Sequence, residues 1–131
     1  MTLMLQKEVV DRICAKKGNK TYGKLSVICQ ILADVKKEFD VSPAAFYPPP
    51  KVHSSIVSIV PRRPYHDKAL INKVREIVHL AFTARRKMLA TSLKFIPDFV
   101  MKELGITKTA RAEDLCPKQY LAIASLLMIQ C

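Results

Sequence analysis

The sequence predicts a mixed α/β segment over residues 1–64, followed by an all-helical segment over residues 65–131. Two patterns support this division. Residues 52–61 form a strand-like run with hydrophobic side chains on both faces, which is typical of a strand buried between two layers. After residue 64 the hydrophobic period changes to that of helices. The first segment has too few strands to form an independent sheet, so it is predicted to be the end of a larger one.

The elements of the first segment follow from local periodicity. Hydrophobic residues recur at i+4 spacing from Leu5 to Ile13, and this predicts an amphipathic helix over residues 3–14 that ends in a polar loop. The apolar residues 25–32 fit a helix or a strand, because their periodicity does not separate the two. Residues 35–41 are charged and strand-like, as is common at the edge of a sheet.

The second segment predicts a series of helices with recognisable ends. Asp67 can cap the first of them. Pro97 opens a short helix that ends at Gly105, and Pro117 opens the last helix. The expected helices cover residues 67–81, about 85–95, 97–105 and 117–128.

The chain is strongly basic. Its 22 Lys and Arg against 11 Asp and Glu give a formal net charge of +11, which predicts attraction to a polyanion such as nucleic acid. A basic membrane-surface protein is the alternative, but no apolar run approaches the ~20 residues of a membrane span, and the N-terminus lacks a signal-peptide pattern. We therefore expect a cytoplasmic protein with reduced thiols and no membrane partner. The cysteines show no metal-ligand spacing with His53, His66 or His79, so no metal site is predicted.

A rigid connector is predicted from Phe46 to Ser54, F-Y-P-P-P-K-V-H-S. Its three successive prolines fix three φ angles and remove three amide donors, so they cannot lie inside a helix or a central strand. Lys51 follows them at the start of a strand, where it can hold an anionic or planar ligand at a fixed distance. The alternative is a rigid turn whose lysine is only solvated.

Four stretches of the sequence, taken in order, resemble one family. They are M-L-Q-K-E-V (4–9), Y-G-K-L-S-V (22–27), F-Y-P-P-P-K-V-H-S (46–54) and F-T-A-R-R-K-M-L (82–89), and R-A-E-D-L (111–115) also matches. The family is that of the bacterial small-subunit (16S) rRNA adenine N6,N6-dimethyltransferases of the kasugamycin-resistance type. The resemblance implies that residues 1–64 are the C-terminal end of a Rossmann-like methyltransferase domain. Residues 65–131 would be its helical, rRNA-binding C-terminal domain.

Two elements that carry chemistry in the family have no counterpart in this sequence. The family binds S-adenosylmethionine on a glycine-rich loop, whereas the three glycines here, Gly18, Gly23 and Gly105, are not in such a spacing. The family's N-L-P-Y or N-P-P-Y motif binds the target amine, but here Asn19 is followed by Lys20 and Asn72 by Lys73. No catalytic and no cofactor-binding residue is therefore assigned to this chain, although the full-length family uses S-adenosylmethionine.

The resemblance implies that the proline connector forms one wall of a pocket for the target base. Phe46 resembles the aromatic residue that sandwiches a flipped base, and the structural alternative is a hydrophobic plug under the prolines. Lys51 is the expected phosphate partner. The residues of this wall are Phe46, Pro48, Pro49, Pro50 and Lys51.

A second RNA-facing group is expected at Arg85, Arg86 and Lys87. Three cations at a helix start oppose the helix dipole, which stability alone does not favour, and guanidinium groups bind phosphates bidentately. The alternatives are a solvated basic corner, or an arginine paired to Glu113 or Asp114. Weaker candidates for RNA contact are Arg62, Arg63, Lys16, Lys17 and Lys20.

The leading hypothesis is the C-terminal part of an rRNA adenine dimethyltransferase that acts on two adenines of small-subunit rRNA in ribosome biogenesis. This part would supply RNA docking and one wall of the base pocket, and it is predicted to be inactive alone. Its expected partner is small-subunit rRNA or the pre-30S subunit. The alternatives are a free-standing basic RNA-binding module, and a remnant that self-associates through uncovered sheet surface.

Overall fold

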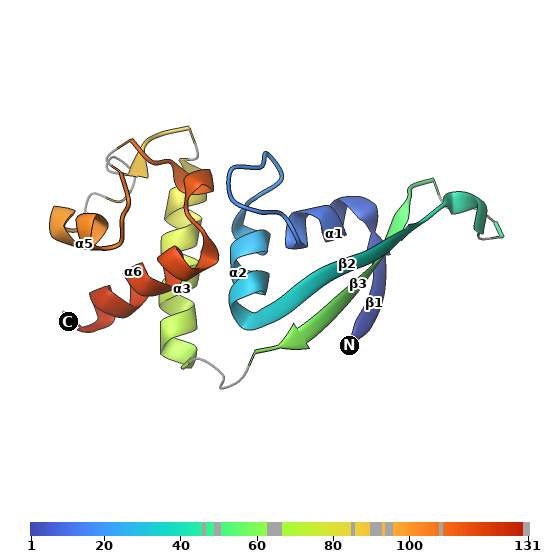
Figure 1. The fold of residues 1–131 in the computed structure, drawn as a ribbon, viewed down its shortest axis with the longest axis horizontal. Helices are drawn as coiled ribbons and strands as arrows, with labels where there is room; N and C mark the ends of the chain where they lie inside the picture. The colour runs from blue at the N-terminus through green and yellow to red at the C-terminus, as the bar shows by residue number, and fades with distance from the viewer. Residues whose placement is uncertain are drawn as a thin grey trace.

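The computed structural model is an α/β fold in which a small antiparallel sheet is followed by a group of helices (Figure 1). The residues that it describes are 1–45, 47–48, 51–62, 67–84, 86–89, 93, 96–107 and 109–129.

The sheet has three antiparallel strands in the order β1-β3-β2. These strands are β1 (Thr2–Gln6), β2 (Ala33–Val41) and β3 (Ser54–Pro61). Helix α1 (Lys7–Ile13) packs against β3, and helix α2 (Lys24–Leu32) packs against β2. The central strand β3 therefore has its Ser55 and Val57 side chains buried.

The N-terminal prediction was wrong in its first half. Residues 2–6 form a strand, and the helix begins only at Lys7. The alternation of Leu3 and Leu5 fits a strand equally well, and β1 pairs with β3 from Thr2 opposite Ser58 to Gln6 opposite Ser54. The backbone hydrogen bonds of this ladder outweigh the i+4 pattern, which continues only from residue 9 onward.

The other predictions for the first segment fared better. Residues 25–32, which fitted either class, lie in a helix, and the charged strand is confirmed at the edge of the sheet. In the described residues helices cover only the Val57 face of β3, as expected if this segment is the end of a larger sheet, and the second layer stays a prediction. On the other face Met4 and Phe39 pair with Ile56 from either side and are 50% and 59% exposed.

Three of the helices predicted after residue 64 are confirmed. They are α3 (Lys68–Thr83), α5 (Asp98–Glu103) and α6 (Pro117–Ile129). Asp67 is the N-cap residue of α3, although its side chain makes no capping hydrogen bond. Gly105 ends α5 with φ +71°, and the N–H of Ile106 donates to the Met101 carbonyl at 2.9 Å, as in a Schellman motif.

The helix expected from about Arg85 falls largely outside the described residues. Where the chain is described, the prediction was wrong at its start, because Arg86 and Lys87 lie in a turn and Met88 forms a β-bridge with Arg111. The Leu89 N–H donates to the Ala110 carbonyl at 2.7 Å, so pairing with a distant segment replaces the first helical turn.

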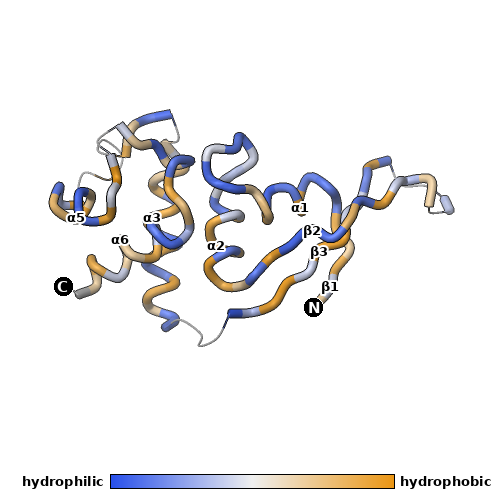
Figure 2. Tube along the Cα trace, viewed as in Figure 1, coloured by the Kyte–Doolittle hydropathy of each residue, from blue (hydrophilic) through white to orange (hydrophobic). Residues whose placement is uncertain are grey.

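One hydrophobic core joins the two parts of the chain. Tyr22, Val27 and Ile31 from around α2 are buried in the same cluster as residues of α3 and α6. The Tyr22 hydroxyl donates to the Leu115 carbonyl at 2.6 Å. Figure 2 shows apolar stretches along α2, α3 and α6 where these helices meet, and a mostly hydrophilic connection between α1 and α2.

Candidate nucleic-acid interface

A pocket of about 400 Å³ lies where β1 ends, α1 begins and the chain enters β3. The Lys7 N–H donates to the His53 carbonyl at 2.9 Å, which holds the start of α1 against the segment that leads into β3. Lys51 is exposed and lies on that segment. The pocket is lined by Gln6, Lys7, Glu8, Asp11, Lys51, Val52 and His53.

A charge network lies beside this pocket. Lys37 Nζ is 3.3 Å from Asp11 Oδ1 and 2.9 Å from Asp40 Oδ1. The buried Ser55 hydroxyl donates to Asp40 Oδ1 at 2.5 Å, and this bond, with that of Lys37, lowers the pKa of Asp40. The hydrogen bond with Asp40 in turn raises the pKa of Lys37. Because Lys37 engages Asp11, the Lys7 and Lys51 ammonium groups are the charges in the pocket best suited to an anion.

Comparison with protein families identifies the chain. The family model described as ribosomal RNA adenine dimethylase matches residues 1–128. The chain belongs to this family.

Relatives of this dimethylase-family chain are similar along almost all of it. Proteins named ribosomal RNA small subunit methyltransferase A are 46% identical over 124 residues in Rhodospirillum rubrum and 39% identical over 138 residues in Nostoc. The alignments cover 93% and 99% of this chain but only 43% and 50% of those proteins. The chain thus spans about half the length of the curated relatives it matches.

Solved structures support the fold. A dimethyladenosine transferase from Plasmodium falciparum matches with TM-score 0.80 and 22% identity over 98% of this chain and 56% of that one. The 23S rRNA methyltransferase ErmE matches with TM-score 0.71 and 21% identity over 97% and 54%. The three-stranded sheet with its helices is therefore part of an α/β methyltransferase fold.

The predicted wall of the base pocket is only partly described. Lys51 lines the pocket, and Pro48 is exposed next to Tyr47, whose side chain is 100% exposed. Phe46, Pro49 and Pro50 lie outside the described residues. The structure thus brings Lys51, but not Pro48, together with residues of β1 and α1.

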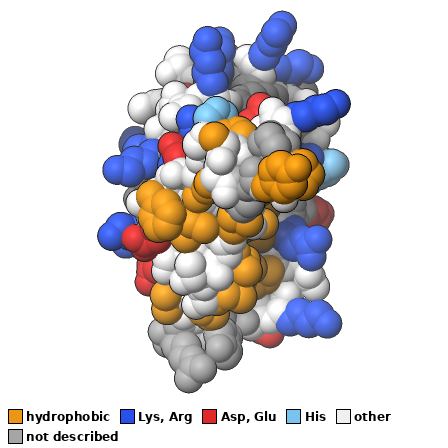
Figure 3. Space-filling model, turned by 90° about the vertical axis from the view of Figure 1, so that its right-hand side faces the viewer, with side chains coloured by type: hydrophobic (Ala, Val, Ile, Leu, Met, Phe, Trp, Pro, Cys, Tyr) orange, Lys and Arg blue, Asp and Glu red, His pale blue; other side chains and the backbone are white. Residues whose placement is uncertain are grey.

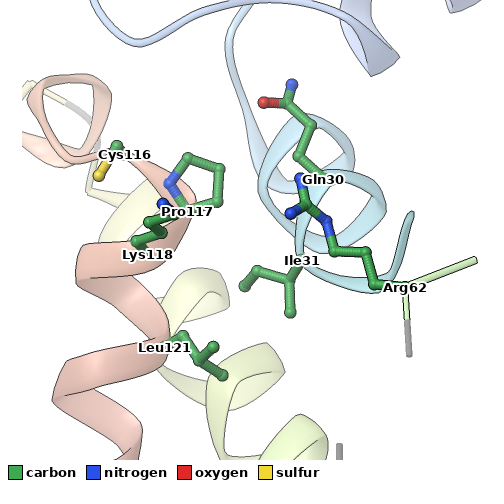
Figure 4. A pocket seen from close by; sticks show the side chains of 7 residues that line it. All are labelled: Gln30, Ile31, Arg62, Cys116, Pro117, Lys118 and Leu121. Carbon is green, nitrogen blue, oxygen red and sulfur yellow. The ribbon is translucent and has the colours of Figure 1, made fainter. Parts of the chain in front are cut away.

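Arg62 lies at the opposite end of β3 from Lys51. The eight-residue strand between them is roughly 26 Å long, so we expect the two cations to bind different phosphates. The Arg62 guanidinium pairs with Asp34 at 2.9 Å. It also lines a pocket of about 300 Å³ between α2 and α6, across from Pro117 and Leu121 (Figure 4). Arg63 lies outside the described residues.

Arg86 and Lys87 are exposed in the turn that follows α3. The helix-dipole argument for their role was wrong, since they follow a helix C-terminus, where cations interact favourably with the dipole. Of the two acids suggested as arginine partners, Asp114 accepts the backbone N–H of Arg111 at 2.9 Å. Arg85 lies outside the described residues.

Sequence reasoning missed the half of the pocket formed by Lys7, Glu8, Asp11 and His53. A signal was present, because the M-L-Q-K-E-V stretch supplies Lys7 and Glu8, but only the tertiary structure places them beside Lys51. Within the described ranges, no three His, Cys, Asp or Glu side chains are grouped as a metal site would need. Likewise, no described helix is long and apolar enough to cross a membrane.

A hydrophobic surface remains on the sheet. Met4, Phe39 and Val60 are 50%, 59% and 53% exposed. Figure 3, which views the end of the molecule that carries the strands, shows hydrophobic side chains gathered across the middle of this end, with Lys and Arg around them. We call Met4, Phe39 and Val60 the open sheet face.

Proposed function

We propose that this chain is the C-terminal part of an S-adenosylmethionine-dependent rRNA adenine N6,N6-dimethyltransferase that modifies two adenines of small-subunit rRNA. Residues 1–64 would complete the methyltransferase domain, and residues 65–131 would form the RNA-binding domain. The match of the dimethylase family model to residues 1–128 carries the proposal. Ribosome assembly on the pre-30S subunit, in the cytoplasm, is the setting that this activity implies.

The pocket beside Lys51 supports a role in presenting the target base. Methyl transfer to adenine N6 requires the base to leave its stack, and an extruded base needs a wall and a held backbone. Lys51 and Lys7 line this pocket and would pair with a phosphate, and the proline connector would form the wall. Phe46 would stack on the base. Farther away, Arg85, Arg86 and Lys87 would dock the RNA, with Arg62 and Arg63 as weaker contacts.

The chain alone is proposed to be inactive, because no glycine-rich cofactor loop and no N-x-P-Y motif occur in its sequence. The test is calorimetric titration with S-adenosylmethionine, followed by a methyl-transfer assay on small-subunit rRNA. Neither cofactor heat nor transfer is expected from the chain by itself. Transfer is expected when the N-terminal half of the Rhodospirillum rubrum relative is co-expressed with it. Stoichiometric cofactor binding by the chain alone would contradict inactivity.

The contribution of Lys51 can be measured separately. Fluorescence anisotropy with a labelled small-subunit rRNA hairpin gives the slope of log K against log salt. Each phosphate contact on single-stranded RNA contributes about 0.7 to that slope, so Lys51→Gln should reduce it by about this amount. Lys36→Gln, which removes an exposed charge on β2 outside residues 65–131, is the matched control and should leave the slope unchanged. If both substitutions changed the slope equally, Lys51 would not be an RNA contact.

A free-standing RNA-binding module is the second candidate, and the net charge of +11 favours it. It predicts the same salt-dependent binding, but no methyl transfer with any companion half. The open sheet face favours a third outcome, self-association. Light scattering tests self-association, since Phe39→Ser should convert an associating chain to a monomer and leave a monomeric chain unchanged.

A further inference from the structure

A second basic pocket, of about 440 Å³, lies at the other end of α1 from the Lys51 pocket. Three exposed cations line it: Arg12 from the end of α1, Lys20 from the following loop, and Lys24 from the first turn of α2. No acidic side chain is among its lining residues. The remaining lining residues are Thr21, Gly23, Leu25 and Ser26.

The sequence around this pocket is unusually one-sided in charge. Between residues 12 and 33 the chain carries Arg12, Lys16, Lys17, Lys20 and Lys24, and the next acid is at position 34. Figure 2 shows the same connection between α1 and α2 as mostly hydrophilic. Five cations in this stretch raise the local positive potential, which attracts an anionic ligand.

The loop that carries these cations is held in place by hydrogen bonds at both ends. The Asn19 side-chain oxygen accepts the Thr21 N–H and hydroxyl, each at 3.0 Å. The Gly18 N–H donates to the Glu113 carbonyl at 2.7 Å, and the buried Tyr22 hydroxyl ties the loop to residue 115. A loop fixed in this way loses little conformational entropy when it binds a ligand.

Two further contacts orient the pocket walls. The buried Ser26 hydroxyl donates to the Arg12 carbonyl, which joins the end of α1 to α2. Lys24 Nζ lies 2.9 Å from His79 Nδ1 on α3, a contact that positions the ammonium group without neutralising its charge. The cations are therefore carried by an ordered loop and two helix ends that hydrogen bonds hold in place.

We propose that the pocket of Arg12, Lys20 and Lys24 binds backbone phosphates of single-stranded RNA. Helix α1 has seven residues and is about 10 Å long, so a few nucleotides link this pocket to the one at Lys51. One RNA strand running along α1 would contact both. The inference rests on the proposed rRNA function and adds contacts that the resemblance did not place.

The experiment compares a pocket variant with a control variant of the full chain, using a fluorescein-labelled oligoadenylate as the probe. Lys20→Gln with Lys24→Gln removes two cations of the pocket, and Lys36→Gln removes one exposed cation of β2, outside both pockets and outside the segment proposed to bind RNA. The pocket variant should reduce the slope of log K against log salt by about 1.4, at about 0.7 for each phosphate contact. The control should change the slope little. All three lysines are exposed, and circular dichroism verifies that both variants fold.

Three results would overturn the inference. The pocket variant keeps the slope of the unaltered chain, or Lys36→Gln reduces the slope by as much per removed charge, or the unaltered chain prefers vesicles of phosphatidylglycerol to RNA. If the unaltered chain shows no salt-dependent RNA binding at all, the proposed function fails together with this inference. If the unaltered chain binds RNA in a salt-dependent way and the pocket variant has the same slope of log K against log salt, the proposed function stands and this inference fails.

Discussion

Replacing Tyr22 with phenylalanine tests how the two parts of the chain are joined. The Tyr22 side chain is fully buried, its hydroxyl donates to the Leu115 carbonyl at 2.6 Å, and its ring meets Phe82 edge-on at a centroid distance of 6.0 Å. Phenylalanine keeps the ring and removes only the hydroxyl. The Leu115 carbonyl then loses its buried donor, which costs about 1–3 kcal/mol. For a chain of this size that corresponds to a fall in Tm of roughly 3–12 °C.

The assay is thermal and urea denaturation followed by circular dichroism, with Tyr47→Phe as the matched control. Tyr47 is 100% exposed, so its substitution should change the unfolding free energy by less than about 0.5 kcal/mol. If Tyr22→Phe is as stable as Tyr47→Phe, the bond to Leu115 contributes nothing and the reasoning is wrong.

The pH dependence provides a second measurement, which concerns the burial of the Tyr22 side chain. Burial raises the pKa of Tyr22, so the folded state favours the neutral phenol. Its contribution is fully present below the unfolded pKa of about 10 and is lost as the pH rises above that value. The stability gap between the unaltered chain and Tyr22→Phe should therefore narrow above about pH 10. A constant gap would show that Tyr22 does not titrate differently in the two states.

Three other predictions concern stability and are measured by urea denaturation. Asp40→Asn should destabilise the chain at about pH 7 but not at about pH 2. The lowered pKa of Asp40 stabilises the folded state above the unfolded pKa, and this contribution is lost as the pH falls through the folded pKa. An equal loss of stability at both pH values would contradict this prediction. Val57→Ala should cost about 1.5–3 kcal/mol because Val57 is buried in the central strand, whereas Val60→Ala on the open sheet face should cost less than about 0.5 kcal/mol. Gly105→Ala should cost about 1–2 kcal/mol at φ +71°, and Gly105→Asn less, since Asn tolerates this conformation; equal costs would mean that the backbone angle is not the cause.

Much of the helical part could be predicted from the sequence because its signals are local. The stripe of α3 repeats within a few turns, and Pro97, Gly105 and Pro117 mark helix ends through their own backbone preferences. The edge position of β2 was predictable from its charges, which are typical of a strand with one side in water.

The strand β1 could not be predicted in this way. Residues 2–6 fit a helical stripe and a strand alternation equally well, and the choice depends on β3, whose paired residues lie 48 to 56 positions farther along the chain. The same is true of the turn at Arg86 and Lys87, which is set by the bridge of Met88 to Arg111. Half of the Lys51 pocket was missed for the same reason, since Glu8 and Asp11 reach it only through the fold.

The sequence by itself determined the basic charge, the family and the helices of the second segment, because composition, motif order and i+4 spacing are properties of the chain alone. Only the tertiary structure decided that residues 2–6 extend along β3, that Lys51 and Arg62 lie at opposite ends of that strand, and that Tyr22 links α2 to the helical part. Ladder hydrogen bonds and a buried hydroxyl each need a partner remote in the chain. The stabilisation from these hydrogen bonds therefore cannot be predicted from local sequence patterns.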